Sequence, residues 1–318
     1  MFNIAIMGCG NIAKRVANGI IYSDGVLYAA ASRDITKARE FAWKYPTCKA
    51  MCYEDVLQDE NVDLVYIATI NTAHYDLIRR CLMAGKNVIC EKPMLANEAE
   101  IKEVFALAEK QHCFLMEAHK TCFIPLNTTV YEKIQEGLIG KVQSIEAFRC
   151  DAVDISCLKE WNVYEPGMGG AFFDIGVYPL CFVNRYAQSR IKEIEVNEKH
   201  CDGYPNDIYA DVTLTYENGV KAEVAAGWKK AKGRGATITG EKGRIEFSDY
   251  WKGTNAKVIL ENEEFEIQVE QDSDFSGEIN EAIHCIENGQ LQSSVMNEEA
   301  SLEIMKVLCR VKESEEKK

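Results

Sequence analysis

The sequence predicts a two-domain α/β protein, in which a doubly wound parallel sheet is followed by an α+β domain with a large, mostly antiparallel sheet. Three observations indicate this fold class. Short apolar segments alternate with amphipathic helical patterns in the first part of the chain, a glycine-rich turn follows the first apolar segment, and segments of alternating polarity dominate the second part. With 318 residues, the chain is also longer than most single domains. We expect the domains to be 1–120 and 121–318.

The first part of the chain carries the signs of repeated strand–helix units. Its short apolar segments are bounded by turn residues, as buried parallel strands are, and apolar residues recur at helical spacing between them. Repetition of strand and helix predicts right-handed βαβ units. The expected strands are 2–8, 26–32, 62–69, 86–91 and 113–118, and the expected helices are 11–22, 35–45, 73–84 and 97–111.

The pattern changes after about residue 120. Segments of period-2 alternation follow one another, and the turn signals Glu217-Asn218-Gly219 and Glu241-Lys242-Gly243 join neighbours, as antiparallel hairpins require. We expect strands in 142–150, 191–199, 207–228, 235–248 and 256–270, and helices near 126–136, 171–186, 274–288 and 298–311.

The composition excludes several classes of partner. The formal net charge is −14, which repels phosphate backbones, so nucleic acid is not expected to bind. Apolar runs are well short of the ~20 residues that a membrane helix needs, and no basic segment precedes the first apolar run, as it would in a secretory signal. We therefore expect a cytoplasmic protein that binds neither nucleic acid nor membrane.

The cysteines point to the same compartment. There are thirteen, and they occur singly in apolar segments, as Cys90, Cys113 and Cys150 do. No pair has CxxC spacing, and Cys48 with Cys52 has no matching His or Cys pair nearby. We expect reduced packing thiols and no metal site.

A glycine-rich turn with GxGxxA spacing directly follows the first strand and opens the first helix. Gly8 permits the tight turn, Gly10 lets a pyrophosphate approach the backbone, and the small Ala13 lets helix and strand pack closely. The N–H groups at the helix start, with Asn11 and Ile12, then face the anion. This context predicts a Rossmann-type dinucleotide site, with a purely structural turn as the alternative.

The choice of dinucleotide depends on the end of the second strand. An NAD site usually places Asp or Glu there to accept from the ribose 2′-OH, whereas this sequence has Ser32. Arg33 follows with a guanidinium suited to a 2′-phosphate, and Lys37 adds charge. NADP is therefore favoured over NAD. The alternative is that Asp34 takes the ribose and Arg33 is an ordinary surface residue.

Three motifs together resemble a known family. Glu91-Lys92-Pro93 follows a parallel strand, downstream of the glycine-rich turn and upstream of GGAFFDIGVY at 169–178. This combination resembles the Gfo/Idh/MocA oxidoreductases, and more closely the branch with dihydrodiol dehydrogenases and NADP-linked D-xylose dehydrogenases. The likeness extends to about residue 185. Its further support comes from Ala31-Ser32-Arg33-Asp34, Phe114-Leu115-Met116-Glu117-Ala118, Thr121 and Phe123-Ile124-Pro125.

The resemblance implies an NAD(P)-dependent enzyme that transfers hydride between the nicotinamide and a CH–OH or C=O group of a sugar, polyol or diol. It implies that Lys92 lies beside the nicotinamide and that Glu91 is on the cofactor side. It also implies that the loop with Ile70, Asn71 and His74 faces the nicotinamide end. From the sequence alone, a single histidine at a helix start is more often a capping or packing residue, so this alternative stays open for His74.

Asp174 and Tyr178 are four residues apart in otherwise apolar surroundings and share one face of the expected helix. Pro179 predicts a kink at this place. Many family members have His at the second position, and Tyr is typical of the dihydrodiol dehydrogenase branch. A tyrosine with pKa near 10 needs about 4 kcal/mol of preferential phenolate stabilisation to act near pH 7. We therefore expect Tyr178 to donate or accept the hydroxyl proton, Lys92 to tune it and Asp174 to orient the substrate. The alternative is a capping Asp174 and a packing Tyr178.

The candidate substrate residues are less specific. His119 and Lys120 stand where related enzymes commonly have an apolar residue followed by Trp, and Lys120 is expected to contact a polar or anionic group. Arg149 and Trp161 either line the substrate pocket or simply pack. The expected partners are a sugar-like small molecule and further copies of the chain, joined through the outer face of the C-terminal sheet as in the family. A non-enzymatic cofactor-sensing protein is the alternative on the same fold.

Overall fold

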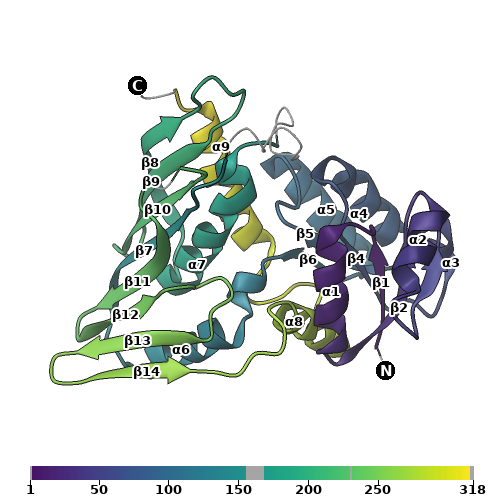
Figure 1. Cartoon of the computed structure of the whole chain (residues 1–318), viewed down its shortest axis with the longest axis horizontal. Helices are drawn as coiled ribbons and strands as arrows, with labels where there is room; N and C mark the ends of the chain where they lie inside the picture. Colours follow the sequence, from purple (N-terminus) through teal and green to yellow (C-terminus); the bar gives the residue numbers. More distant parts are fainter. Residues whose placement is uncertain (1, 155–167, 230, 316–318) are drawn as a thin grey trace. The chain divides into compact units, whose positions relative to one another are not determined.

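The computed structural model describes residues 2–154, 168–229 and 231–315 (Figure 1). The chain forms two compact units. The first unit combines Met1–Phe123 with Asp272–Ser301, and the second combines Ile124–Gln271 with Leu302–Lys318. Within the described parts of the chain, no helix is both long enough and apolar enough to cross a membrane.

The first unit contains a six-stranded parallel sheet in the order β3-β2-β1-β4-β5-β6. Central strands such as β4 are buried at every position, because a parallel sheet has helices over both faces. The order reverses between β1 and β4, which is where doubly wound sheets bind ligands. The strands are β1 (Phe2–Met7), β2 (Gly25–Ala31), β3 (Lys49–Met51), β4 (Leu64–Ile67), β5 (Asn87–Glu91) and β6 (Leu115–Ala118).

The helices of the first unit begin where the sequence supplies caps. The Asp34 side chain accepts from the Thr36 amide at the start of α2, and Asn97 accepts from the Glu100 amide at the start of α5. The predicted strands and helices of this unit are confirmed, whereas β3 and α3 are additional. The helices are α1 (Asn11–Ile21), α2 (Ile35–Ala42), α3 (Tyr53–Gln58), α4 (His74–Met83), α5 (Glu98–Gln111) and α8 (Ser276–Glu287).

The helix α8 belongs to the first unit although it lies more than 250 residues after α1. A Cβ at Gly19 in α1 would stand 2.5 Å from the Phe275 side chain and 3.2 Å from that of Ile279, so the two helices pack closely. The Arg15–Asp274 ion pair, at 2.6 Å, joins the same segments. The expected domain 121–318 therefore differs from the unit that the contacts define, since 272–301 packs with the first unit.

The second unit contains an eight-stranded sheet in the order β14-β13-β12-β11-β7-β10-β9-β8. All neighbours are antiparallel except β7 and β10, which are parallel. The expected mostly antiparallel sheet is confirmed. Its strands are β7 (Val142–Cys150), β8 (Ile191–His200), β9 (Tyr209–Tyr216), β10 (Lys221–Gly227), β11 (Arg234–Gly240), β12 (Gly243–Phe247), β13 (Asn255–Leu260) and β14 (Glu264–Gln268).

Helices cover one face of this sheet, where α7 (Val177–Ala187) packs against β7 and β10 (Figure 1). A π-helical segment, η5 (Phe172–Gly176), leads directly into α7. The other helices are α6 (Pro125–Gln135) and α9 (Glu298–Glu313), which begins at the end of the first unit and continues into the second. Along β11, β12 and β13, buried residues alternate with half-buried or exposed residues, as in a sheet that is covered on one face.

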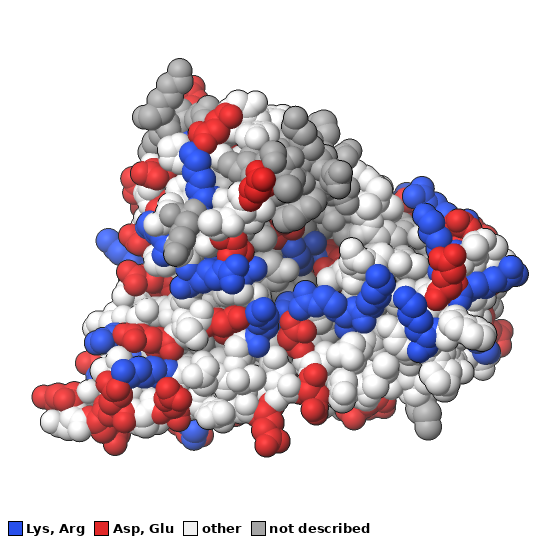
Figure 2. Space-filling view, in the orientation of Figure 1, with Lys and Arg blue, Asp and Glu red and all other residues white. Residues whose placement is uncertain are grey.

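Acidic side chains protect the edge of this sheet. Glu261, Glu263, Glu264 and Glu266 are all exposed, and Figure 2 shows acidic side chains gathered at the β13–β14 end, with basic side chains among them. Charges on an edge strand discourage pairing with another chain.

Candidate functional site

The glycine-rich turn between β1 and α1 has two different glycines. Gly8 has φ +113°, and a Cβ there would stand 2.3 Å from the carbonyl oxygen of Ala68, so only glycine fits between β1 and β4. Gly10, in contrast, has no atom of the described residues within 4 Å of a Cβ position. Asn11 is exposed, Ile12 is half-buried, and Gly10 offers no side-chain cap. The open space beside Gly10, at the start of α1, leaves room for the pyrophosphate of a dinucleotide.

The residues after β2 fit the ribose end of the same cofactor. Ser32 Oγ accepts from the Asp34 amide at 3.2 Å, and Asp34 in turn accepts from the Thr36 amide at 2.9 Å. The carboxylate of Asp34 is thus used as a helix cap. Arg33 and Lys37 are both exposed. Two cations and a capped helix start at this place fit an anionic group such as a phosphate.

In the loop after β4, the exposed Ile70 precedes Asn71, which starts a short 3₁₀ helix, η1 (Asn71–Ala73). His74 is fully buried, with Nδ1 3.1 Å from the carbonyl oxygen of Met94 and Nε2 3.4 Å from that of Thr69. Burial lowers the pKa of His74, so the ring is neutral near pH 7. The histidine therefore ties this loop to the segment that follows β5.

The Glu91-Lys92-Pro93 segment is held on both sides. Its Lys92–Pro93 peptide bond is cis. Next to it, the Met94 carbonyl meets His74, and the Met94 amide donates to Glu117 Oε1 at 2.9 Å. Because both backbone groups of Met94 have buried partners, the half-buried Lys92 starts from a fixed backbone.

Lys120 pairs with an acidic side chain of the same unit. It is buried in η2 (Lys120–Cys122), pairs with Asp274, and lies 5.3 Å from the centre of the Phe275 ring. Burial lowers the pKa of Lys120, and Asp274 offsets part of this effect. The charge of Lys120 is thus matched within the first unit. His119 is also buried, with Nε2 3.3 Å from Glu117 Oε1.

These residues share one edge of the parallel sheet, since each group directly follows the carboxyl end of a strand. In the described part of the chain, no group of three or more His, Cys, Asp and Glu side chains has the arrangement of a metal site. The groups are Gly8 to Ile12 after β1, Ser32 and Arg33 after β2, Ile70 to His74 after β4, Glu91 and Lys92 at the end of β5, and His119 and Lys120 after β6.

In the second unit, Asp174 lies in the π-helical segment and Tyr178 in the first turn of α7, and both are half-buried. The predicted kink before Pro179 takes the form of this wider helical turn, because the ring cannot donate to Ile175. π-Helical turns are frequent at functional sites. The second unit therefore presents the carboxylate and the phenol from one irregular helical segment.

Asp207, which the sequence patterns did not single out, fixes the start of that segment. Its Oδ2 accepts from the Phe172 amide at 2.8 Å, and its own carbonyl accepts from the Ala171 amide at 2.8 Å. Gly170 has φ +112°, and a Cβ there would stand 2.3 Å from Asp207 Oδ1. Burial raises the pKa of Asp207 to about 6. The Gly169-Gly170 pair was the available signal, since it marks a place where another group comes close.

Arg149 is committed to neighbours within the second unit. Its guanidinium lies 3.7 Å from the centre of the Trp251 ring, and Nη2 is 3.1 Å from Asp151 Oδ2. Asp151 also pairs with Arg234. The packing alternative describes these contacts of Arg149. Trp161 lies outside the described residues.

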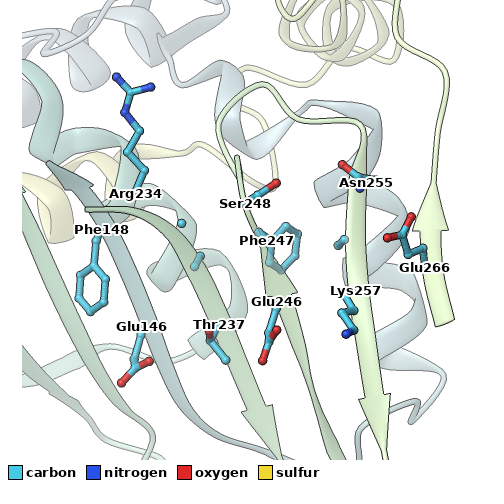
Figure 3. A pocket seen from close by; sticks show the side chains of 13 residues that line it. Glu146, Phe148, Arg234, Thr237, Glu246, Phe247, Ser248, Asn255, Lys257 and Glu266 are labelled. Carbon is cyan, nitrogen blue, oxygen red and sulfur yellow. The ribbon is translucent and has the colours of Figure 1, made fainter. Parts of the chain in front are cut away.

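A shallow pocket of about 450 Å³ lies on the exposed face of the eight-stranded sheet (Figure 3). None of the expected site residues lines it. A row of aligned side chains crosses it, from Glu146 through Thr237, Glu246 and Lys257 to Glu266 on five neighbouring strands. The pocket is a feature of the sheet surface rather than of the candidate site.

Together, the strand–glycine turn–helix unit and the anchored lysine segment define a dinucleotide-binding α/β protein with an additional α+β domain. Residues 2–119 match the family described as "Oxidoreductase family, NAD-binding Rossmann fold", and residues 128–246 match the "GFO/IDH/MocA C-terminal domain". The chain belongs to the Gfo/Idh/MocA oxidoreductase family. The predicted fold, oxidoreductase class and family are thereby confirmed.

Curated relatives support the same branch. The chain is 32% identical over 305 residues to trans-1,2-dihydrobenzene-1,2-diol dehydrogenase of Mus musculus, covering 92% of this chain and 90% of that protein. It is 30% identical over 286 residues to the Homo sapiens protein of the same name, covering 86% and 84%.

Solved structures share the fold at lower identity. Aldose-aldose oxidoreductase from Caulobacter crescentus, complexed with glycerol, has a TM-score of 0.87 at 20% identity and covers 98% of this chain and 96% of its own. A 3-ketoreductase from Actinomadura kijaniata, in complex with NADP and TDP-benzene, has a TM-score of 0.81 at 22% identity and covers 98% and 97%.

Proposed function

We propose that the protein transfers hydride between NADP(H) and a CH–OH or C=O carbon of a sugar, polyol or diol. The observation that carries the proposal is the Glu91-Lys92-Pro93 segment, anchored through Met94 at the carboxyl edge of a dinucleotide-binding sheet. The names of the relatives support the substrate class, since they act on diols and sugars. The sequence departs from related enzymes at His119 and Lys120, so the individual substrate differs from theirs in this proposal.

The proposed cofactor contacts follow from the exposed groups of the first unit. The amides that follow Gly10 hold the pyrophosphate, and Arg33 with Lys37 binds the 2′-phosphate of NADP. When bound, the nicotinamide supplies the hydride acceptor or donor. The neutral His74 holds the loop with Ile70 and Asn71 in a fixed position relative to the lysine segment.

The proposed proton chemistry belongs to Tyr178. Hydride transfer to or from an alcohol carbon requires that the hydroxyl lose or gain a proton, and Tyr178 exchanges it. Lys92 supplies the positive charge that a tyrosine needs to ionise near neutral pH, because a nearby cation lowers a phenol pKa. Asp174 accepts a hydrogen bond from a second hydroxyl and so orients the substrate.

The test is single-turnover oxidation of bound NADPH with a panel of aldoses, hydroxyketones and dicarbonyls. We expect at least one polyhydroxylated carbonyl compound to oxidise NADPH, with NADP⁺ and the alcohol formed in equal amounts. Tight NADPH binding without turnover of any compound would instead support a cofactor-sensing regulatory protein.

We also propose that the chain forms homo-oligomers through the exposed face of the eight-stranded sheet, as the family resemblance implies. The row of aligned side chains from Glu146 to Glu266 marks this face (Figure 3). Light scattering after size exclusion measures the assembly. A cytoplasmic location is proposed as well, supported by the free buried thiols of Cys90, Cys113 and Cys150.

A further inference from the structure

Three buried polar side chains meet at the Glu91 end of β5. The hydroxyl oxygen of Tyr66, in β4, lies 3.0 Å from Glu91 Oε1 and 2.8 Å from Oε1 of Glu278, in α8. The relative exposures of Tyr66, Glu91 and Glu278 are 0%, 8% and 1%. All three belong to the first unit, although Glu278 follows Tyr66 by 212 residues. Two buried carboxyl groups thus share one phenol that has no exposed surface.

The number of protons in this group follows from its geometry. A tyrosine hydroxyl carries one hydrogen and donates to one oxygen. Burial and the two acidic neighbours raise the pKa of Tyr66 well above its ordinary value, so the hydroxyl keeps that hydrogen. The carboxyl group that does not accept this hydrogen can form a hydrogen bond with the Tyr66 oxygen only if it is protonated and acts as the donor. At least one of Glu91 and Glu278 is therefore a neutral acid.

The surroundings of the two carboxyl groups differ. Glu91 Oε2 lies 3.3 Å from the Lys92 amide, and the Lys92 charge opposes the rise in pKa that burial causes at Glu91. Glu278 Oε2, in contrast, is buried with no hydrogen-bond partner among the described residues. A bare buried oxygen costs much more free energy on a carboxylate than on a neutral acid.

On balance, the surroundings of Glu278 also raise its pKa. Burial raises the pKa of Glu278 well above its ordinary value, and Glu91 and Asp274 raise it further. Tyr66 and Lys120 oppose this, but Lys120 is already paired with Asp274. The proton therefore belongs on Glu278.

We propose that Glu278 is a neutral carboxylic acid that donates to the Tyr66 oxygen, so that Tyr66 donates to an anionic Glu91. This chain of hydrogen bonds sets the side-chain orientation and the charge of Glu91. Through Glu91, it sets the position of the Glu91-Lys92-Pro93 segment. Glu278 is thus a positioning residue that acts through Tyr66. Its effect on turnover rests on the proposed function, whereas its protonation does not.

Infrared difference spectroscopy tests the protonation directly. We expect the wild-type protein at pH 7 to show the C=O stretch of a protonated carboxylic acid, sensitive to D₂O, that is lost in Glu278→Gln. Tyr66→Phe should shift this band, because the acid loses its acceptor. Glu117→Gln is the matched control from a buried carboxyl whose net pKa is lowered, and it should remove no such band. The proposal is overturned if Glu278→Gln also removes no protonated-acid band at neutral pH.

Proton linkage gives a second readout that needs no substrate. The raised pKa of Glu278 means that its contribution to stability is fully present below about pH 4.5 and is lost as the pH rises toward the pKa in the folded state. The Tm of Glu278→Gln relative to wild type should therefore increase steadily from pH 5 to pH 8. A difference in Tm that does not change with pH contradicts a neutral Glu278.

Turnover then measures the positioning effect. Glu278→Leu should lower kcat about tenfold with little change in NADPH affinity, while Glu278→Gln, which keeps a neutral donor, should stay within about threefold of wild type. If the kcat of Glu278→Leu equals that of wild type, the Glu278–Tyr66–Glu91 hydrogen bonds have no positioning role. If wild type itself turns over no substrate, the proposed function fails, and the infrared and linkage results still decide the protonation of Glu278.

Discussion

Tyr178 is a weak base as a free side chain, because its phenol has a pKa near 10. Its replacement therefore tests the proton transfer most directly. We expect Tyr178→Phe to lower kcat by about 10²–10⁴-fold, the usual contribution of a general acid or base. NADPH affinity should stay within about twofold, since the phenol is assigned to the substrate and not to the cofactor. Stopped-flow turnover and fluorescence titration measure the two quantities.

The matched control for this change is Tyr131→Phe, which removes the exposed hydroxyl that donates to Gln188 in the same unit. This variant should have wild-type kcat. Wild-type turnover by Tyr178→Phe as well would assign the proton transfer to another group.

The proposal assigns cofactor choice to Arg33, because Asp34 is occupied as the cap of α2. We expect Arg33→Ala to weaken NADPH binding by about 10- to 100-fold, as the loss of a charge-assisted contact to a phosphate does. NADH binding should change by less than about threefold. Isothermal titration with both cofactors measures the difference.

Arg39→Ala removes another exposed arginine, from the helix α2 that follows Arg33, and serves as the control. Equal losses for NADPH and NADH in Arg33→Ala would mean that Arg33 does not distinguish the 2′-phosphate.

At the scale of an element, the two glycines of the turn between β1 and α1 should have different roles, Gly8 in stability and Gly10 in cofactor binding. Gly8→Ala should lower the free energy of unfolding by about 2–4 kcal/mol, because the backbone has positive φ and the new Cβ meets the Ala68 carbonyl. Gly10→Ala should leave unfolding nearly unchanged but weaken NADPH about tenfold, since its methyl group stands where the pyrophosphate approaches. Urea unfolding and cofactor titration of both variants provide the comparison. A Gly10→Ala protein with normal affinity would place the pyrophosphate elsewhere.

The contribution of the π-helical segment to stability should depend on pH, because Asp207 holds the start of this segment. Because burial raises the pKa of Asp207 to about 6, its contribution to stability is fully present below pH 3.8 and is lost as the pH rises through about 6. Relative to wild type, Asp207→Asn should therefore gain up to about 3 kcal/mol between pH 4 and pH 7. Calorimetry over this range measures the gain. If the difference in unfolding free energy between the two proteins did not change with pH, the pKa of Asp207 would be the same in the folded and unfolded states.

At the scale of the whole molecule, periodicity predicted nearly every long element. The parallel strands are continuous apolar segments and the antiparallel strands alternate, so both patterns are visible in one sequence. The strand β3 has only three residues and α3 only six, which is too short for a period to appear. The position of α8 was not predictable, because it depends on contacts between Phe275 and Gly19 that leave no local pattern.

The candidate site was predictable where chemistry is local. The glycine turn and the lysine segment are short motifs, and both can be recognised from the sequence alone. Glu117, Asp207 and Glu278 were not, because a buried carboxyl group is recognised by its tertiary partners rather than by its neighbours in sequence. The pairing of Lys120 with Asp274 was likewise not visible in the sequence, because the two residues are far apart along the chain.

The return of α8 to the first unit has a consequence for protein synthesis. The ribosome makes the cofactor-binding sheet first, but the helix that covers α1 and carries Glu278 emerges only after the eight-stranded sheet has been made. Until then, Gly19 and the apolar face around it lack their partner, and Tyr66 lacks one of its two acids. A nascent chain that stops before residue 272 therefore leaves its nucleotide-binding half unfinished, so this half is completed late although its synthesis begins first.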